Sequence, residues 1–459
     1  MGLIFTLLMT YGGAAVSLVR PYYGFLIYVC FSIIRPESLW HWSVPPGNYS
    51  RIIAVAFLLG WALSGFGNWS FGRARRPAFA LLWFLIWAAV SAALCEYPQV
   101  ALSFLENMAK IVLPTLAGLT LINTRKDIWQ LAWTIVGSVG YVAYDLNRSY
   151  FDGFNRLAFD GFGGMDNNSM TIGLVTGVGF AFFLGLSETV AWRRYLSFAF
   201  AAFLTHAVFF SFSRGGMLGL CVVGLATAVV IPKTSRNLGL MTLGVVIALA
   251  MAGPEVVERF SSMTNTTLTG ADEGEADWSA ESRIDLWRIC GQMTLESPVF
   301  GKGPDHFPRL VDRYRITGGV SDAYGSGKEA HTLWLQIMAE LGLPGLFLLA
   351  AFYGLTLSEL WRYVRLDKSD SQGLTPGATA RMVWTALVGF IVSAQFVSLE
   401  GLELPYYVCL VGLSFLKLQA AEDLQEIHGD VCDGEVLRYA TPWGREPAAW
   451  HGASPADSR

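Results

Sequence analysis

Charged residues are scarce in this chain, and their scarcity excludes a water-soluble fold. Only 15% of the 459 residues are charged, whereas soluble domains contain about 25%. A hydrophobic share of 53% and a mean hydropathy of +0.43 accompany this deficit. The 32 Lys and Arg against 36 Asp and Glu give a net charge of −4, so no surface for nucleic acid is indicated. We therefore expect a membrane protein and exclude a cytosolic enzyme, a disordered scaffold and a collagen-like fibre.

Cysteine is also sparse, and its spacing excludes two common kinds of site. The six cysteines include no C-x-x-C pair, so neither a zinc site nor a thioredoxin-like motif is indicated. Basic residues are missing ahead of the first apolar stretch, so we expect that stretch to be a membrane segment rather than a cleaved signal peptide.

Apolar stretches, by contrast, recur along the whole sequence. Most are long enough to cross a hydrocarbon core of about 30 Å. They predict an all-α polytopic membrane protein with about 12 transmembrane helices, or 13 if the short stretch after Arg20-Pro21 is counted separately. The stretches are 3–19, 21–34, 52–68, 78–94, 101–122, 128–147, 169–187, 195–212, 215–232, 237–253, 331–357, 380–397 and 402–418.

Basic residues between these stretches orient the chain, because short cytoplasmic loops carry an excess of Lys and Arg. Basic clusters occur in alternate loops, at 73–76, 125–126, 193–194, 233–236 and 362–368. The segments expected on the periplasmic side are then 35–51, 148–168, the 213–214 junction, 254–330 and 398–404. We predict N-terminal transmembrane helices over 1–253, a periplasmic loop over 254–330, C-terminal transmembrane helices over 331–418 and a disordered cytoplasmic tail over 419–459.

The large loop 254–330 contains one clear helix in the sequence pattern. Ser282 and Asp285 resemble a capping box at its start. Ile284, Trp287 and Cys290 then recur at helical spacing, and Pro298 marks the end.

Arg214 stands between two apolar stretches, in the run Ser211-Phe-Ser-Arg-Gly-Gly216. A charged residue at membrane depth is costly and usually faces a cavity with a function. The next helix starts here, and a cation at a helix N-terminus opposes the helix dipole. An anionic ligand resolves that conflict, since backbone amides and the arginine then converge on it. The alternative is an interfacial arginine that only extends its charge into a loop.

Arg283 and His331 are two further candidates in the same large loop. Arg283 opens the predicted loop helix, and a guanidinium matches phosphate better than an ammonium does. His331 lies where the chain returns to the membrane, and an unperturbed imidazole with a pKa near 6.5 can act as a general base. The alternatives are a surface arginine and a hydrated interfacial histidine. A zinc site at His331 is disfavoured, because no second His or Cys stands at a ligand spacing from it.

Two more arginines belong to the Gly- and Asn-rich periplasmic segment 148–168. Arg148 and Arg156 can add positive charge to a phosphate pocket, and an ordinary connecting loop is the equal alternative.

These features together resemble the O-antigen ligase and Wzy-type polymerase superfamily. The resemblance is carried by three landmarks in the family's order, which are Ser213-Arg214-Gly215, then Ser282-Arg283 with Leu286-Trp287, then His331 with Leu335-Gln336 and Glu340-Leu-Gly342. It covers roughly residues 150–415, and the first fifty residues look like the ligase-like proteins that accompany exosortase systems. The chain departs from the pattern at Thr332, where relatives often have Asn.

The resemblance implies a GT-C-like, metal-independent inverting glycosyltransferase without a cofactor, an O-antigen ligase of lipopolysaccharide biosynthesis in the bacterial inner membrane. The implied donor is a glycan on undecaprenyl pyrophosphate, and the implied acceptor is a hydroxyl of lipid A–core. Arg214 and Arg283 would then hold the pyrophosphate, and His331 would activate the acceptor hydroxyl. A Wzy-type polymerase, a protein O-oligosaccharyltransferase, and more distantly a transporter or flippase remain as alternatives.

Overall fold

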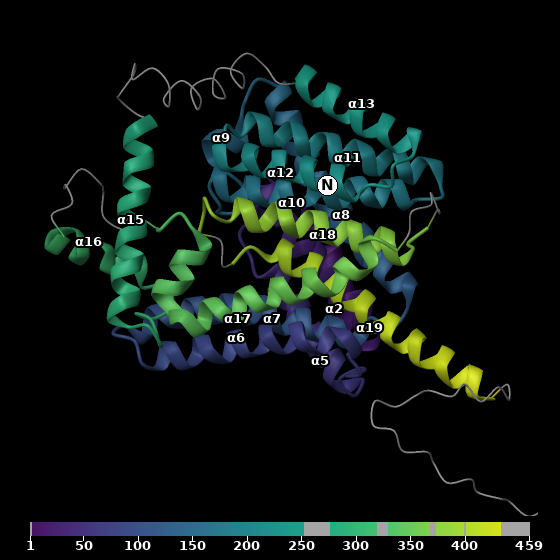
Figure 1. Cartoon of the computed structure of the whole chain (residues 1–459), viewed down its shortest axis with the longest axis horizontal. Helices are drawn as coiled ribbons and strands as arrows, with labels where there is room; N and C mark the ends of the chain where they lie inside the picture. The colour runs from purple at the N-terminus through teal and green to yellow at the C-terminus, as the bar shows by residue number, and fades with distance from the viewer. Residues whose placement is uncertain (1, 252–275, 319–328, 367–372, 399–400, 433–459) are drawn as a thin grey trace, which may run out of the picture. The chain divides into compact units, whose positions relative to one another are not determined.

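The computed structural model describes residues 2–251, 276–318, 329–366, 373–398 and 401–432, and this part of the chain is helical with no β-strand. The chain divides into one compact unit of residues 1–418 and a second unit of residues 419–459. Figure 1 shows the helices, which are α1 (Gly2–Leu7), η1 (Leu8–Gly12), α2 (Gly13–Val19), α3 (Pro21–Ile34), α4 (Pro36–Leu39), α5 (Tyr49–Leu63), η2 (Gly72–Ala74), α6 (Arg75–Ala93), α7 (Pro98–Leu121), α8 (Arg125–Phe151), α9 (Arg156–Asp160), α10 (Asn167–Ser187), α11 (Ala191–Phe210), α12 (Arg214–Val230), α13 (Ser235–Met251), α15 (Ala276–Glu296), α16 (Phe307–Gly318), α17 (Leu333–Val364), α18 (Pro376–Ser393) and α19 (Glu403–Cys432).

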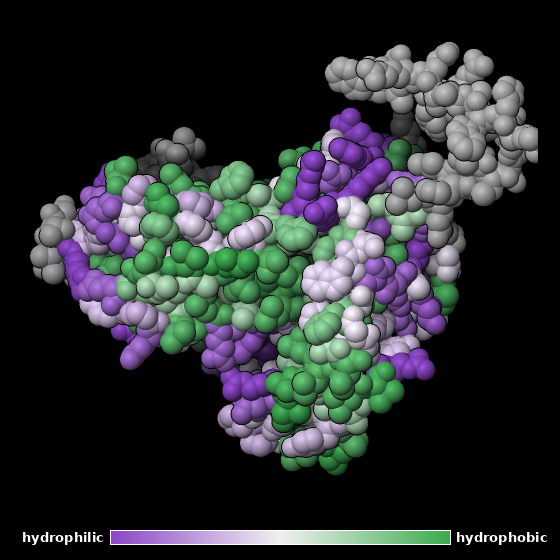
Figure 2. Space-filling model, turned by 90° about the horizontal axis from the view of Figure 1, so that it is seen from below, coloured by the Kyte–Doolittle hydropathy of each residue, from purple (hydrophilic) through white to green (hydrophobic). Residues whose placement is uncertain are grey.

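The predicted all-helical membrane fold is confirmed, but the expected number of about 12 spans is not. Six of the described helical segments are long and apolar enough to cross a membrane, which are Gly2–Val19, Gly72–Ala93, Pro98–Leu121, Asn167–Ser187, Leu333–Val364 and Glu403–Asp423. Three shorter apolar helices are Tyr49–Leu63, Arg214–Val230 and Ser235–Ile247. Figure 2 shows broad hydrophobic patches on one face, with hydrophilic residues between and around them. Such a surface is unusual for a soluble monomer and fits contact with lipid.

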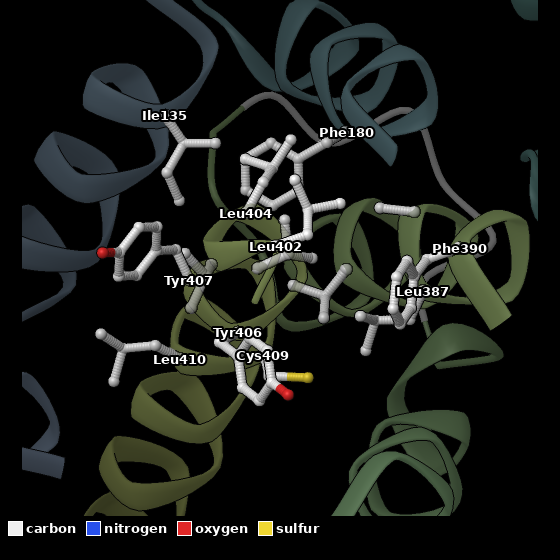
Figure 3. Packing of buried hydrophobic residues seen from close by; sticks show 14 of the residues in the cluster. Ile135, Phe180, Leu387, Phe390, Leu402, Leu404, Tyr406, Tyr407, Cys409 and Leu410 are labelled. Carbon is white, nitrogen blue, oxygen red and sulfur yellow. The ribbon is translucent and has the colours of Figure 1, made fainter. Parts of the chain in front are cut away.

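The core forms where α19 packs among its neighbours. Tyr406 and Tyr407 of α19 are almost wholly buried, and Figure 3 shows them with Phe390 of α18 and Ile135 of α8 in the same cluster. Around this centre α10 packs on α11 and α18, α12 packs on α18, and α17 packs on α6. The bundle therefore holds helices that are far apart in sequence against one another.

The start of one helix, the presence of a second loop helix and the start of the tail differ from the sequence prediction. α15 begins at Ala276, so Ser282 lies inside the helix rather than at its start. A second loop helix, α16, follows at Phe307–Gly318 and was not predicted. α19 continues to Cys432, so residues 419–432 are helical although a disordered tail was expected from 419. Residues 433–459 of that tail, and 254–275 and 319–328 of the large loop, lie outside the described residues.

The helix expected over 331–357 is broken. Gly342 has a φ of 71°, which interrupts α17 and divides it into two helical pieces. A Cβ at this position would lie 2.1 Å from the carbonyl oxygen of Val299, so only glycine allows the approach. A Cβ on Gly301 would lie 2.2 Å from the carbonyl oxygen of Glu340, and Gly301 also has a positive φ of 68°. The turn after α15 therefore interlocks with the break in α17.

Candidate functional site

Arg214 is the first residue of α12, at a sharply turned junction after α11. Ser213 is the N-cap, and its hydroxyl accepts a hydrogen bond from the amide of Gly216 at 3.2 Å. Phe212, just before it, adopts a left-handed φ of 55°. Asn167 of α10 donates from its side chain to the carbonyl of Ser211 at 3.1 Å. The junction is thus held in place, and the Arg214 side chain is half-buried.

Arg283 lies on α15, which is docked on the first part of α17. Leu286, Ile289 and Met293 of α15 form a buried cluster with Val311 of α16 and Ala339 of α17. This cluster fixes the helix, because its buried apolar face has a partner on two other elements. The Arg283 side chain is half-buried beside that face.

His331 stands immediately before α17 in a strained conformation. Its φ is 51°, in the left-handed region that non-glycine residues seldom adopt. The amide of Ala330 donates to the side-chain oxygen of Gln336 at 3.1 Å, and the amide of Leu333 donates to the carbonyl of Ala394 at 2.9 Å. Strain of this kind persists only where the surroundings fix it, and it clusters at functional sites. The histidine is therefore held firmly from both sides.

Arg214 and Arg283 interact electrostatically. Burial and the positive charge of Arg214 both lower the pKa of Arg283, with burial the larger cause. Across the described residues, neither guanidinium has a carboxylate within ion-pair distance. Two half-buried like charges repel one another, and an anion placed between them would remove both the repulsion and the desolvation cost.

His331 adjoins the same helix as Arg283. Ala330, its neighbour in sequence, is fully buried in the cluster that contains Leu286, three residues after Arg283. Packing between α15 and α17 thus carries His331 to the side of the site that Arg283 occupies. Arg214 belongs to α12, Arg283 belongs to α15, and His331 precedes α17. The fold places these three segments in one region.

Arg148 and Arg156 are engaged elsewhere. Arg148 is exposed and forms an ion pair with Asp152 at 3.7 Å. Arg156 pairs with Asp145 at 3.2 Å, donates to the carbonyl of Ser38, and stacks over the ring of Phe162. The contacts of Arg156 fasten the segment around α9 to α8 and to α4. Their role in substrate binding stays a prediction.

Two polar atoms near the candidates were not singled out by sequence reasoning. The indole nitrogen of Trp287 and the hydroxyl of Thr332 are buried and have no hydrogen-bond partner among the described residues. Trp287 follows Arg283 by one helical turn, and Thr332 follows His331 directly. Buried polar atoms are nearly always paired. These two are therefore candidates for contact with a ligand, and only their burial reveals them.

Glu340 has a supporting role that the sequence did not reveal. It is 1% exposed, and its carboxylate accepts hydrogen bonds from the backbone amides of Asp305 at 2.8 Å and Phe307 at 2.9 Å. These bonds fix the start of α16 against α17. Sequence spacing places Glu340 out of phase with His331, and the structure likewise directs it to the turn before α16.

The pKa of Glu329, two residues before His331, is affected by its surroundings. Burial raises the pKa of Glu329, and the carboxylates of Asp305 and Asp166 raise it further, whereas a hydrogen bond from Ser398 lowers it. Nowhere in the described ranges do three or more His, Cys, Asp or Glu side chains form a group able to hold a metal ion.

Contacts between loops show that the segments with basic clusters meet at one end of the helices. Lys417 of α19 donates from its ammonium group to the carbonyls of Asn68 at 3.2 Å and Ile122 at 3.1 Å. Arg73 donates to the hydroxyl of Tyr363, close to the C-terminal end of α17. At the other end, Arg35 pairs with Glu403 at 3.1 Å and also donates to a carbonyl of the 153–166 segment. This grouping agrees with the alternation expected from the loop charges.

The described residues form a multi-pass, all-helical membrane protein in which Arg214 and Arg283 interact electrostatically. Residues 198–350 match the O-antigen ligase family, and this match supports the resemblance to the O-antigen ligase and Wzy-type superfamily. That segment contains Arg214, Arg283 and His331. Residues 1–146 match a family of unknown function. None of the curated proteins matches the chain.

Proposed function

We propose that this protein is an O-antigen ligase that transfers a glycan from undecaprenyl pyrophosphate to a hydroxyl of lipid A–core. The reaction takes place at the periplasmic end of an inner-membrane protein and inverts the anomeric configuration. The family supplies the lipid-linked glycan as donor class, and the pair of arginines supplies the chemical reason for a pyrophosphate. The lipid pyrophosphate is already an activated leaving group, so no nucleotide takes part.

The proposed chemistry assigns one role to each of the three candidates. The acceptor oxygen attacks the anomeric carbon while His331 takes its proton. The bond from that carbon to the pyrophosphate oxygen breaks, and the electron pair leaves with the pyrophosphate. Arg214 and Arg283 stabilise the negative charge that develops there. The proton remains on His331 until the products leave.

The observation that supports this proposal most strongly is the relationship between the two arginines. Each is half-buried, the charge of Arg214 lowers the pKa of Arg283, and neither has a carboxylate partner among the described residues. A structural ion pair would contain a counterion within the chain. An arrangement of this kind is instead complete only with an anion that has several acceptor oxygens, as pyrophosphate has.

The experiment is a ligation assay with the purified full chain in detergent or nanodiscs. The donor is an undecaprenyl-pyrophosphate glycan, the acceptor is lipid A–core, and nucleotide is omitted. We expect a product in which the glycan is joined to lipid A–core, with release of undecaprenyl pyrophosphate. The protein with Arg214→Ala is the matched negative control. Membranes of the same cells serve as the positive control. If they form the product and the purified chain does not, the proposal is contradicted.

The alternatives are separated by the acceptor. Joining of two lipid-linked glycan units identifies a Wzy-type polymerase, and transfer to a protein hydroxyl identifies a protein O-oligosaccharyltransferase. Movement of donor across reconstituted vesicles without formation of a new bond identifies a transporter or flippase. All four reactions start from the same donor, so one preparation answers the question.

A further inference from the structure

An apolar groove lies between the end of α5, the start of α6 and the end of α7. Its volume is about 290 Å³, and its lining includes Leu58, Trp61, Phe66, Trp69, Phe79 and Leu113. Phe66, Trp69 and Phe79 are 48%, 53% and 40% exposed, so the groove opens to the outside of the helices. α6 and α7 belong to segments that are long and apolar enough to span a membrane. The groove therefore faces lipid.

The shape of the groove is built into the backbone. Phe66 has a left-handed φ of 64° and stands between Gly65 and Gly67, whose φ angles are also positive. A Cβ on Gly67 would lie 2.6 Å from the hydroxyl oxygen of Thr120, so the turn requires glycine there. The ring of Phe66 meets that of Trp61 edge to face at 4.9 Å. Strained residues of this type persist where surroundings over-determine them, as in ligand clamps.

Trp61 is fixed as well. Its indole nitrogen donates to the hydroxyl of Thr120 at 2.7 Å. Its ring lies 6.3 Å from that of Trp69, which in turn lies 5.5 Å from Phe71. The groove wall is thus a connected set of aromatic rings that is ready before any ligand arrives.

Positive charge stands at the rim. Arg75 and Arg76 are exposed in the first turn of α6, and the guanidinium carbon of Arg75 is 5.6 Å from the ring centre of Phe79, which lines the groove. Within the described segments, neither arginine has a carboxylate at ion-pair distance. A cation at a helix N-terminus opposes the helix dipole. An anion bound there would supply a counterion to the arginines and would also interact favourably with the dipole.

We propose that the groove binds one anionic phospholipid, with an acyl chain along the aromatic wall and the headgroup phosphate on Arg75 and Arg76. A soluble anion would leave the apolar wall unused, and a lipid without net charge would leave the two arginines uncompensated. Basic residues next to a membrane helix are attracted to anionic lipid in the leaflet they face. This site is at the opposite end of the helices from Arg214, so it is independent of the proposed ligation.

The test is binding of phosphatidylglycerol and phosphatidylcholine to the delipidated full chain, followed by native mass spectrometry. We expect one tightly held phosphatidylglycerol and weaker phosphatidylcholine. The double variant Arg75→Ala/Arg76→Ala should weaken phosphatidylglycerol by roughly 10- to 30-fold, from about fivefold per basic residue. Ala62→Trp should also weaken it, because the new ring fills the groove while both arginines remain. Arg125→Ala/Lys126→Ala removes equal charge and is the matched control, with unchanged binding.

A photoreactive phosphatidylglycerol with a diazirine in its acyl chain provides a measurement that needs no variant. Crosslinks should fall within residues 58–82 and 113–116 of the unaltered protein. Crosslinks spread evenly over the other membrane helices overturn the proposal. Equal affinity for both lipids, or unchanged binding in the folded Arg75→Ala/Arg76→Ala protein, overturns it as well.

Discussion

The charge of Arg214, at the start of α12, lowers the pKa of Arg283 on α15. These two half-buried residues therefore repel one another in the protein as it stands, and each becomes more stable when an anion lies between them. The relationship couples a membrane helix to a loop helix electrostatically.

Replacement of either arginine should abolish most activity without loss of fold. Arg214→Ala and Arg283→Ala should each reduce the ligation rate by about 10²–10³-fold, because a charged donor to the leaving group is lost. Lys at either position keeps the charge but not the planar fork, so it should fall between Ala and the native residue. The unfolding temperature of each alanine variant should equal or exceed that of the native protein, because one of the two repelling charges has been removed.

Arg288→Ala is the matched control for these arginines, because Arg288 lies on the same helix and its exposed side chain pairs with Asp285 at 3.1 Å. Its ligation rate should be near that of the native protein. Full activity of a folded Arg214→Ala protein contradicts the assignment.

His331→Ala should reduce ligation by about 10²–10⁴-fold while donor binding remains measurable. The rate of the native protein should fall as the pH is lowered, because a protonated imidazole cannot accept the acceptor's proton. A cationic role would give the opposite trend. His331→Arg and His331→Lys separate the two roles in the same assay, since near-normal turnover in either discards the general base and leaves an electrostatic function.

Trp287→Phe and Thr332→Val test whether the two unpaired polar atoms contact the donor. Neither atom has a hydrogen-bond partner among the described residues. Thr332→Val keeps the shape of the side chain and should not lower the unfolding temperature, whereas Trp287→Phe also removes ring volume and should lower it slightly. Donor affinity should fall by roughly fivefold to tenfold for each hydrogen bond lost, which is about 1–1.5 kcal/mol. Binding of labelled donor measures this, and unchanged affinity in both variants shows that the atoms face no ligand.

Gly342→Ala should destabilise the protein by at least about 3 kcal/mol. Alanine is strained by about 1–3 kcal/mol at a φ of 71°, and its Cβ would in addition collide with the Val299 carbonyl. Gly354→Ala is the control within the same helix, where an added Cβ meets no atom within 4 Å. That change should be neutral or stabilise by about 0.5–1 kcal/mol. Thermal unfolding of both proteins measures the difference, and equal effects would disprove the interlocked turn.

Glu329→Gln should stabilise the protein at neutral pH and have little effect at pH 4. The pKa of Glu329 is raised by burial and by Asp305 and Asp166, so the folded state binds this proton more tightly than the unfolded state. Stability therefore declines as pH rises from the unfolded pKa through the folded pKa, and then stays level. Unfolding temperatures of both proteins across this range give the comparison. A variant that is less stable than the native protein at pH 7 contradicts the sign.

The membrane class, most of the helices and the candidate residues could all be predicted from the sequence. Few charges, long apolar stretches and basic clusters in alternate loops are local properties, so they can be recognised without a fold. Arg214, Arg283 and His331 stood out because each is a charged or titratable residue next to an apolar stretch or a helix start. The sequence left open whether the first two apolar stretches are separate, and in the structure α2 ends at Val19 and α3 begins at Pro21.

How these residues are placed relative to one another depends on the packing of the helices, which the sequence pattern does not reveal. The break at Gly342 depends on the approach of the turn after α15, and α16 is positioned by two backbone bonds to the buried Glu340. The unpaired atoms of Trp287 and Thr332, and the effect of Arg214 on Arg283, depend on how α12, α15 and α17 are placed relative to one another. Periodicity reports which face of one helix is apolar. It does not report which other helix covers that face, and the site is made at those contacts.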